Sequence, residues 1–196
     1  MKMYTDSQKV ILTDADGVLL DWKYAFQVWM DSHGHTQTKE DIYDAGEQYG
    51  LTKPDAKRLV KMFNESAAIG FLPPLRDAIH YVRMLHEKHG YVFHCITSLS
   101  TDNHACELRT QNLKRLFGQT AFEKFIYLDT GADKDEALAN YKNSECFWIE
   151  DKAENADCGH RMGLNSLLVR HHHNVNYKGP AKVVGNWKEI YEIITG

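Results

Sequence analysis

The 196-residue sequence lacks the features that mark several protein classes. It has no apolar run near the roughly 20 residues that cross a bilayer, and no apolar stretch at its start that resembles a signal peptide. Its 23 Lys and Arg residues do not outnumber its 27 Asp and Glu residues, so no nucleic-acid polymer is expected as a partner. The four cysteines show no short metal-type spacing, which favours a reducing, cytoplasmic setting.

Hydrophobic residues make up 43% of the chain, enough for one compact domain with a small insert. Short apolar runs that end at turn residues predict buried strands. They lie at 10–13, 91–96, 146–149 and 166–169, with weaker candidates at 125–128 and 182–184. Between them, helical periodicity occurs at 75–88, 102–117, 134–141, 153–162 and 187–194. This alternation predicts an α/β fold with a Rossmann-like, doubly wound parallel sheet.

One segment interrupts the alternation. Residues 21–74 show no convincing strand and contain three predicted helices, at 22–32, 38–48 and 53–66, the last with Thr52 as its N-cap. We therefore expect a core of residues 1–20 and 75–196 with a helical cap inserted after the first strand. Ligands of open α/β sheets bind at the carboxyl edge of the strands, which such a cap would cover.

Polar residues follow three of the four best strands. Asp14 and Asp16 come after the first, Thr97 and Ser98 after the second, and Asp151 after the third. Three converging carboxylates repel one another unless a cation compensates, and an all-oxygen site suits Mg²⁺. Short acids also cap turns, and Asp-Gly is a turn signal, so ordinary turn chemistry is the alternative explanation.

The segment Asp14-Ala15-Asp16-Gly17-Val18 resembles the first motif of the haloacid dehalogenase superfamily, most of whose members are phosphatases. Thr97 resembles its second motif and Lys134 its third. The segment Trp148-Ile149-Glu150-Asp151, followed by Asn155, resembles the fourth. All four motifs occur in the expected order on the expected strand ends.

This resemblance implies a Mg²⁺-dependent phosphomonoester hydrolase. Asp14 would attack phosphorus to form an aspartyl-phosphate, and Asp16 would act as general acid and then general base. The metal would be held by Asp14, the Asp16 backbone carbonyl and Asp151, while Thr97 and Lys134 would hold the phosphoryl oxygens. Dehalogenases lack the second acid, so Asp16 favours phosphoryl transfer. A catalytically silent protein that binds a phosphorylated ligand is the alternative from another class.

Two positions depart from the family pattern. Glu150 stands where Gly or Asp is commoner, and could bind the metal or point away from it. Lys134 is not followed by the usual proline, which leaves Lys142 as a competitor for the third-motif role. We prefer Lys134 because it opens a predicted helix at a strand-to-helix junction.

The segment 16–22, together with the Thr97-Ser98 pair, resembles 5'(3')-deoxyribonucleotidases. That resemblance implies that Ser98 and Trp22 contact the substrate, Trp22 against a nucleobase. The alternative is that Trp22, Phe26 and Trp29, which share one helical face, form the core of the cap. Sugar phosphates remain a second substrate class, and the sequence predicts no particular oligomeric state. The run at 171–173 of three histidines has no further ligands nearby and predicts a solvated loop.

Overall fold

A computed structural model of the chain describes residues 9–40, 42 and 44–196. The expectation of no signal peptide, and the first part of the predicted core, fall on residues 1–8 and lie outside the described residues. The same holds for residues 41 and 43 of the helix predicted at 38–48. Among the described residues, no helix is both long and apolar enough to span a membrane.

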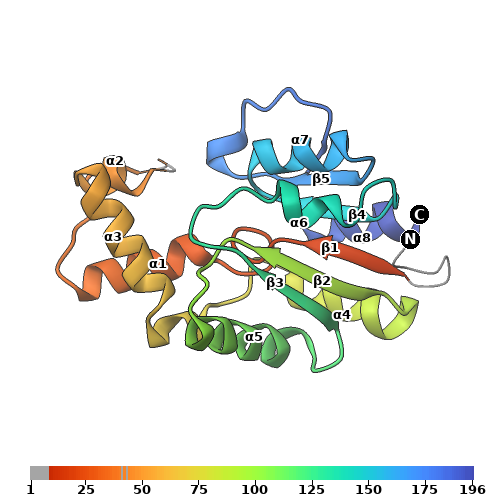
Figure 1. Cartoon of the computed structure of the whole chain (residues 1–196), viewed down its shortest axis with the longest axis horizontal. Coiled ribbons are helices and arrows are strands. Elements are labelled where there is room, and N and C mark those ends of the chain that lie inside the picture. Colours follow the sequence, from red (N-terminus) through yellow and green to blue (C-terminus); the bar gives the residue numbers. More distant parts are fainter. Residues whose placement is uncertain (1–8, 41, 43) are drawn as a thin grey trace.

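A parallel sheet forms the centre of the described structure (Figure 1). Its strands are β1 (Val10–Thr13), β2 (Val92–Thr97), β3 (Phe122–Tyr127), β4 (Phe147–Glu150), β5 (Asn165–Val169) and β6 (Lys182–Val184). Their order is β3-β2-β1-β4-β5-β6, so the predicted doubly wound α/β sheet is confirmed. The chain changes direction across the sheet at β1, and the carboxyl ends of β1, β2 and β4 are therefore neighbours.

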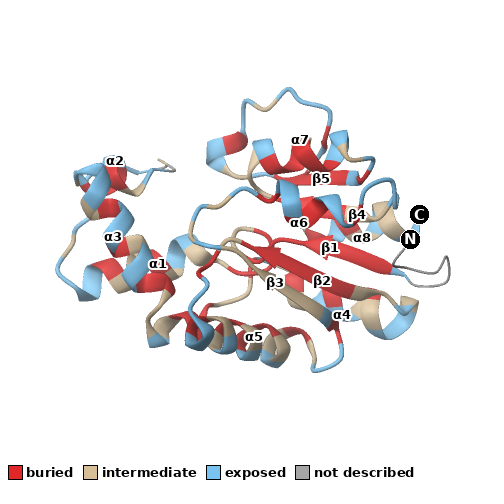
Figure 2. Cartoon of the chain, in the orientation of Figure 1, coloured by how far each residue is buried: buried red, intermediate tan, exposed pale blue. Residues whose placement is uncertain are grey.

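Helices cover both faces of this sheet. One face carries α4 (Ala78–His89), α5 (Asn103–Phe117) and α8 (Trp187–Thr195), and the other carries α6 (Asp135–Ala139) and α7 (Ala153–Arg161). Successive strand residues point to opposite faces, so Ile11 packs in the first core and Leu12 in the second. Figure 2 shows the buried central strands and the exposed outer sides of the helices. A short 3₁₀ helix, η2 (His172–Asn174), follows β5.

The predicted helical cap after the first strand is present. It comprises α1 (Trp22–Ser32), α2 (Ala45–Tyr49), α3 (Lys53–Asn64) and the 3₁₀ helix η1 (Ala67–Phe71). Helices α1 to α3 lie beyond the end of the sheet at which β1 ends (Figure 1). The Thr52 side chain caps α3 by accepting the backbone N–H of Asp55, as predicted. The boundaries 21–74 of the cap remain a prediction.

The helix predicted at 38–48 is wrong in its extent. Among the described residues of that range only α2 is helical, because the Asp44 side chain accepts the backbone N–H of Glu47 and starts the helix at Ala45. The backbone N–H groups of Thr38 and Lys39 donate to the carbonyl of Gln48, so this segment folds back along α2.

Helix α7 packs unusually close to the sheet at Gly159. A Cβ atom there would lie 2.4 Å from Cδ1 of Trp148 in β4 and 2.8 Å from Oγ of Ser166 in β5. The absence of a side chain at this position thus lets α7 sit against the strand that leads to Asp151.

We predict that Gly159→Ala lowers the free energy of unfolding by about 1–3 kcal/mol because it overpacks this contact. The loss occurs although Ala favours a helix by about 1 kcal/mol over Gly. Denaturant unfolding measures the change, with His160→Ala on the exposed side of α7 as the control. A Gly159→Ala variant as stable as the wild type would contradict the close packing.

Candidate active site

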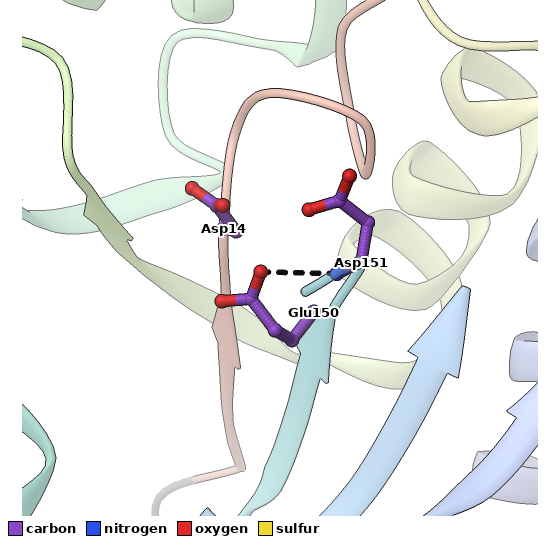
Figure 3. Close-up of side chains that lie close together, drawn as sticks. All are labelled: Asp14, Glu150 and Asp151. Atoms are coloured by element: carbon purple, nitrogen blue, oxygen red, sulfur yellow. Dashed lines mark hydrogen bonds between the residues drawn. The ribbon is translucent and has the colours of Figure 1, made fainter. Parts of the chain in front are cut away.

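Three carboxylates meet where β1 and β4 end. Asp14 follows β1, Glu150 is the last residue of β4, and Asp151 comes next. The backbone N–H of Asp14 donates to the carbonyl of Ile149 at 2.9 Å, which extends the pairing of the two strands to the site. One oxygen of each carboxylate lies within 4.8 Å of the others (Figure 3).

Lys134 brings a positive charge into this cluster. It stands directly before α6, and its Nζ lies 2.6 Å from Oδ2 of Asp14 and 2.7 Å from Oε2 of Glu150. Its side chain is 2% exposed. Burial alone would lower the pKa of Lys134, but the two carboxylates outweigh it and hold the pKa above its ordinary value. Lys142, the competing residue, is exposed in the turn after α6.

Glu150 points into the cluster, and its acceptor positions are occupied. Its Oε1 accepts the backbone N–H groups of Asp151 and Lys152, each at 3.0 Å. Its Oε2 accepts from Lys134 and, at 3.3 Å, from Nδ2 of Asn155. These donors outweigh burial and hold the pKa of Glu150 below its usual value. Glu150 is therefore held against Lys134 by the donors that surround it.

The charges at this site do not balance. Three carboxylates face one ammonium group, which leaves two negative charges in a buried place. Burial raises the pKa of Asp14 to about 6 although Lys134 opposes the shift. Burial, with the charges of Glu150 and Asp14, raises the pKa of Asp151 well above its ordinary value. A divalent cation bound by oxygen ligands would balance this excess, so the donor set fits Mg²⁺.

Asp16 lies beside the cluster and faces another cation. Its Oδ1 accepts from Nη1 of Arg109 at 2.7 Å, and the guanidinium is fully buried. Burial raises the pKa of Asp16, while Arg109 opposes the shift. The Asp16 carboxylate is thus not one of the three that cluster, and its predicted metal contact through the backbone carbonyl stays a prediction.

The second-motif hydroxyls differ in what they contact. Thr97 is 1% exposed at the end of β2, and its Oγ1 has no hydrogen-bond partner among the described residues. A buried donor of this kind suits an oxygen of a bound ligand. Ser98, in contrast, donates its hydroxyl to the carbonyl of Ala132 at 2.7 Å. In this arrangement the Ser98 hydroxyl holds the loop before Lys134, and its predicted contact with substrate stays a prediction.

Trp22 belongs to the aromatic core of the cap. Its ring stacks on Phe26 at 4.7 Å between centroids and meets Phe63 edge-on at 5.5 Å. Its indole N–H donates to Oδ1 of Asn64, whose Nδ2 donates to the carbonyl of Leu99 in the loop after β2. Trp22 therefore helps tie the cap to the site, and its role against a nucleobase remains a prediction.

In the histidine run His172 and His173 are exposed, as predicted for a solvated loop, and His171 is half-buried, but two of the imidazoles also contact the loops of the site. His171 Nε2 lies 2.6 Å from the carbonyl of Gly17, and His173 Nε2 lies 3.0 Å from that of Asp151. Burial lowers the pKa of both imidazoles. Asn174 also donates to the Asp151 carbonyl, at 2.8 Å. Because β5 lies beside β4, the segment after β5 contacts and supports the loops that follow β1 and β4.

Arg109 and Asn174 are the contributors to the site that sequence reasoning did not identify. A signal for Arg109 exists, since Ala105, Arg109 and Leu113 recur at four-residue spacing on the buried face of α5. A charged residue on an apolar helix face calls for a partner. Nothing in the local sequence indicates that this partner is Asp16.

The comparisons with known proteins support the fold. No protein-family model matches the chain. A relative from Enterobacteria phage T4, an uncharacterized 32.4 kDa protein in the Gp30-rIII intergenic region, is 26% identical over 156 residues. The match covers 75% of this chain, and the chain spans 55% of the length of that relative.

Solved structures match almost the whole chain. A haloacid dehalogenase-like family hydrolase from Streptococcus pneumoniae has a TM-score of 0.66 at 16% identity, covering 97% of this chain and 100% of that one. YfnB from Bacillus subtilis, bound to magnesium, has 0.62 at 11%, covering 96% and 99%. A haloacid dehalogenase family hydrolase from Deinococcus radiodurans, with bound phosphate and sodium, has 0.61 at 18%, covering 97% and 96%. The chain therefore has the haloacid dehalogenase-like fold with a helical cap.

We predict that Asp151→Asn raises the melting temperature of the metal-free protein at pH 7 by roughly 2–4 °C, the shift that 1 kcal/mol produces at this size. The raised pKa of Asp151 means that folding becomes less favourable as pH rises through that pKa. The gain should therefore vanish as pH is lowered towards 4. Calorimetry tests this, with the exposed Asp133→Asn as the control. A lower melting temperature for Asp151→Asn at pH 7 would contradict the charge excess.

Proposed function

We propose that the chain is a Mg²⁺-dependent phosphomonoester hydrolase that acts through an aspartyl-phosphate on Asp14. The observation that carries this proposal is the buried cluster of Asp14, Glu150 and Asp151, in which Lys134 neutralises only one of three charges. A divalent cation and a phosphoryl group together fit such a place, because each compensates charge that the other brings.

Asp14 is held in one orientation. Its Oδ1 accepts the backbone N–H of Ala15 at 2.6 Å, and its Oδ2 accepts from Lys134 at 2.6 Å. A nucleophile held in place on both oxygens loses little freedom when it attacks phosphorus. Lys134 and the unpartnered Oγ1 of Thr97 would donate to the phosphoryl oxygens and stabilise the charge of the transition state.

Asp14 and Asp151 would hold the metal, with the Asp16 backbone carbonyl as the third protein ligand. The bound Mg²⁺ would offset the repulsion between the Asp14 carboxylate and the anionic phosphate. Glu150 keeps Lys134 in place, and the carbonyl of Asp151 is fixed by His173 and Asn174. These contacts fix Lys134 and the backbone at Asp151 before substrate arrives.

Asp16 supports phosphoryl transfer over dehalogenation. A halide leaves without a proton, whereas an alkoxide needs one, and Asp16 is the second acid beside Asp14. The substrate would be a small phosphomonoester under the cap, a nucleoside monophosphate or a sugar phosphate. A silent ligand-binding protein is the weaker candidate, because Asp14, Asp16, Lys134 and Asp151 are all in place.

We expect phosphate release from a panel of phosphomonoesters, including deoxynucleoside and sugar phosphates, that requires added Mg²⁺. Asp14→Asn should remove it by at least about 10⁴-fold, because the nucleophile is lost. Colorimetric detection of phosphate measures the rate, and Asp133→Asn serves as an exposed control. Folded protein that binds Mg²⁺ but releases no phosphate from any ester would favour the ligand-binding alternative.

Two lysines allow a matched test of the third motif. We expect Lys134→Met to lower kcat by about 10²–10³-fold, the usual effect of removing one transition-state donor. Lys142→Met should leave kcat within about twofold, because that side chain is exposed. Steady-state kinetics on the best ester of the panel, with melting temperatures to confirm folding, measures both. A larger loss in Lys142→Met would exclude Lys134 from the role.

A further inference from the structure

The Arg109–Asp16 pair is a poor arrangement for stability. The Arg109 side chain is 0% exposed, yet it has one charged partner, Asp16, which is itself 24% exposed. Its Nε and Nη2 have no hydrogen-bond partner in the part of the chain that the structure describes. Replacing both members of a buried ion pair by apolar residues is often neutral or stabilising, whereas removing one member leaves the other charge without its partner. Arg109 thus acts in this structure chiefly as the cation that faces Asp16.

The geometry of the pair does constrain the Asp16 carboxyl group. Nη1 of Arg109 donates to Oδ1 of Asp16 at 2.7 Å, and this donor comes from a side chain that is fixed by its burial in α5. With Oδ1 engaged, a proton carried by Asp16 must be on Oδ2. The neighbouring Asp14, two residues earlier in the chain, directly follows β1. The ion pair thus sets which oxygen of Asp16 can exchange a proton with a group bound at Asp14.

We propose that Arg109 is a positioning residue that holds Asp16 so that Oδ2 delivers the proton to the leaving group. This inference rests on the proposed function. When Oδ of Asp14 forms its bond to phosphorus, the bond from phosphorus to the ester oxygen breaks. The proton of Asp16 Oδ2 moves to that oxygen, which leaves as an alcohol, and Asp16 becomes a carboxylate paired with Arg109.

Two aryl phosphates that differ only by a nitro group distinguish a role of Arg109 in positioning the proton donor from a general structural role. p-Nitrophenolate is a good leaving group that needs little protonation, whereas phenolate is a poorer one that needs more. Single-turnover release of each phenol from p-nitrophenyl phosphate and phenyl phosphate reports the first step alone. The variants are Arg109→Met, Arg109→Lys and, as control on the exposed side of α5, Gln111→Met.

In Arg109→Met, the rate with phenyl phosphate should fall at least about tenfold more than with p-nitrophenyl phosphate, within the range of general acid catalysis. Arg109→Lys should recover part of this difference, because it restores a donor to Asp16. Because Arg109→Met leaves the Asp16 carboxylate without its cation, a lower melting temperature is expected, and the rates are compared at a temperature at which both proteins are folded. Equal losses on both esters in Arg109→Met would overturn the proposal.

A second measurement uses Asp16→Asn, which keeps the acceptor for Arg109 and removes the proton. In that background Arg109→Met should cost less than about twofold further, because the two residues act through the same proton. If Arg109→Met instead lowers the rate as much in the Asp16→Asn background as in the wild type, Arg109 acts through another group and the proposal is overturned. A wild type inactive on both esters and on the whole panel would instead refute the hydrolase function, and with it this role of Arg109. The activity of the wild type therefore distinguishes a failure of the Arg109 proposal from a failure of the hydrolase function.

Discussion

The buried ammonium group of Lys134 is the interaction on which the site depends. It lies within 2.7 Å of carboxylates from both β1 and β4 and so joins the ends of two adjacent strands. Without it, three carboxylates would face one another, two of them buried and the third partly buried. With it, and with all three carboxylates ionised, two negative charges remain, which a divalent cation would balance.

The surrounding contacts keep this charged cluster in place. Glu150 accepts from Lys134 and from three other donors, and the segment after β5 holds the carbonyl of Asp151. On the other side, Asn64 links the aromatic core of the cap to the loop after β2. Hydrogen bonds thus join the cap to the loop after β2, next to the strand that leads to Asp14. Because burial raises the pKa of Asp14 and Asp151, we expect this cluster to lower the stability of the metal-free protein at neutral pH.

Local patterns in the sequence were sufficient for most of the elements. The strand at 10–13 and the helix at 22–32 have the predicted bounds: an apolar run that ends at a turn defines the strand, and aromatic residues on one helical face mark the helix. The helix predicted at 38–48 is shorter than expected. The Asp44 side chain caps the backbone there, so the helix begins only at Ala45. The weak strand candidate at 125–128 is part of β3, which begins earlier, at Phe122. Pairing with β2 sets this longer extent, and no local sequence pattern reports such pairing.

The sequence by itself determined the α/β alternation, the helical insert, the order of Asp14, Thr97 and Asp151 at strand ends, and the place of Lys134 before a helix. The tertiary structure decided what these residues face. Arg109 meets Asp16 across 93 positions and His171 meets Gly17 across 154, because strand order and helix packing bring them together. Periodicity reports which face of an element is apolar, but partners so distant in the chain are set only by how the elements pack.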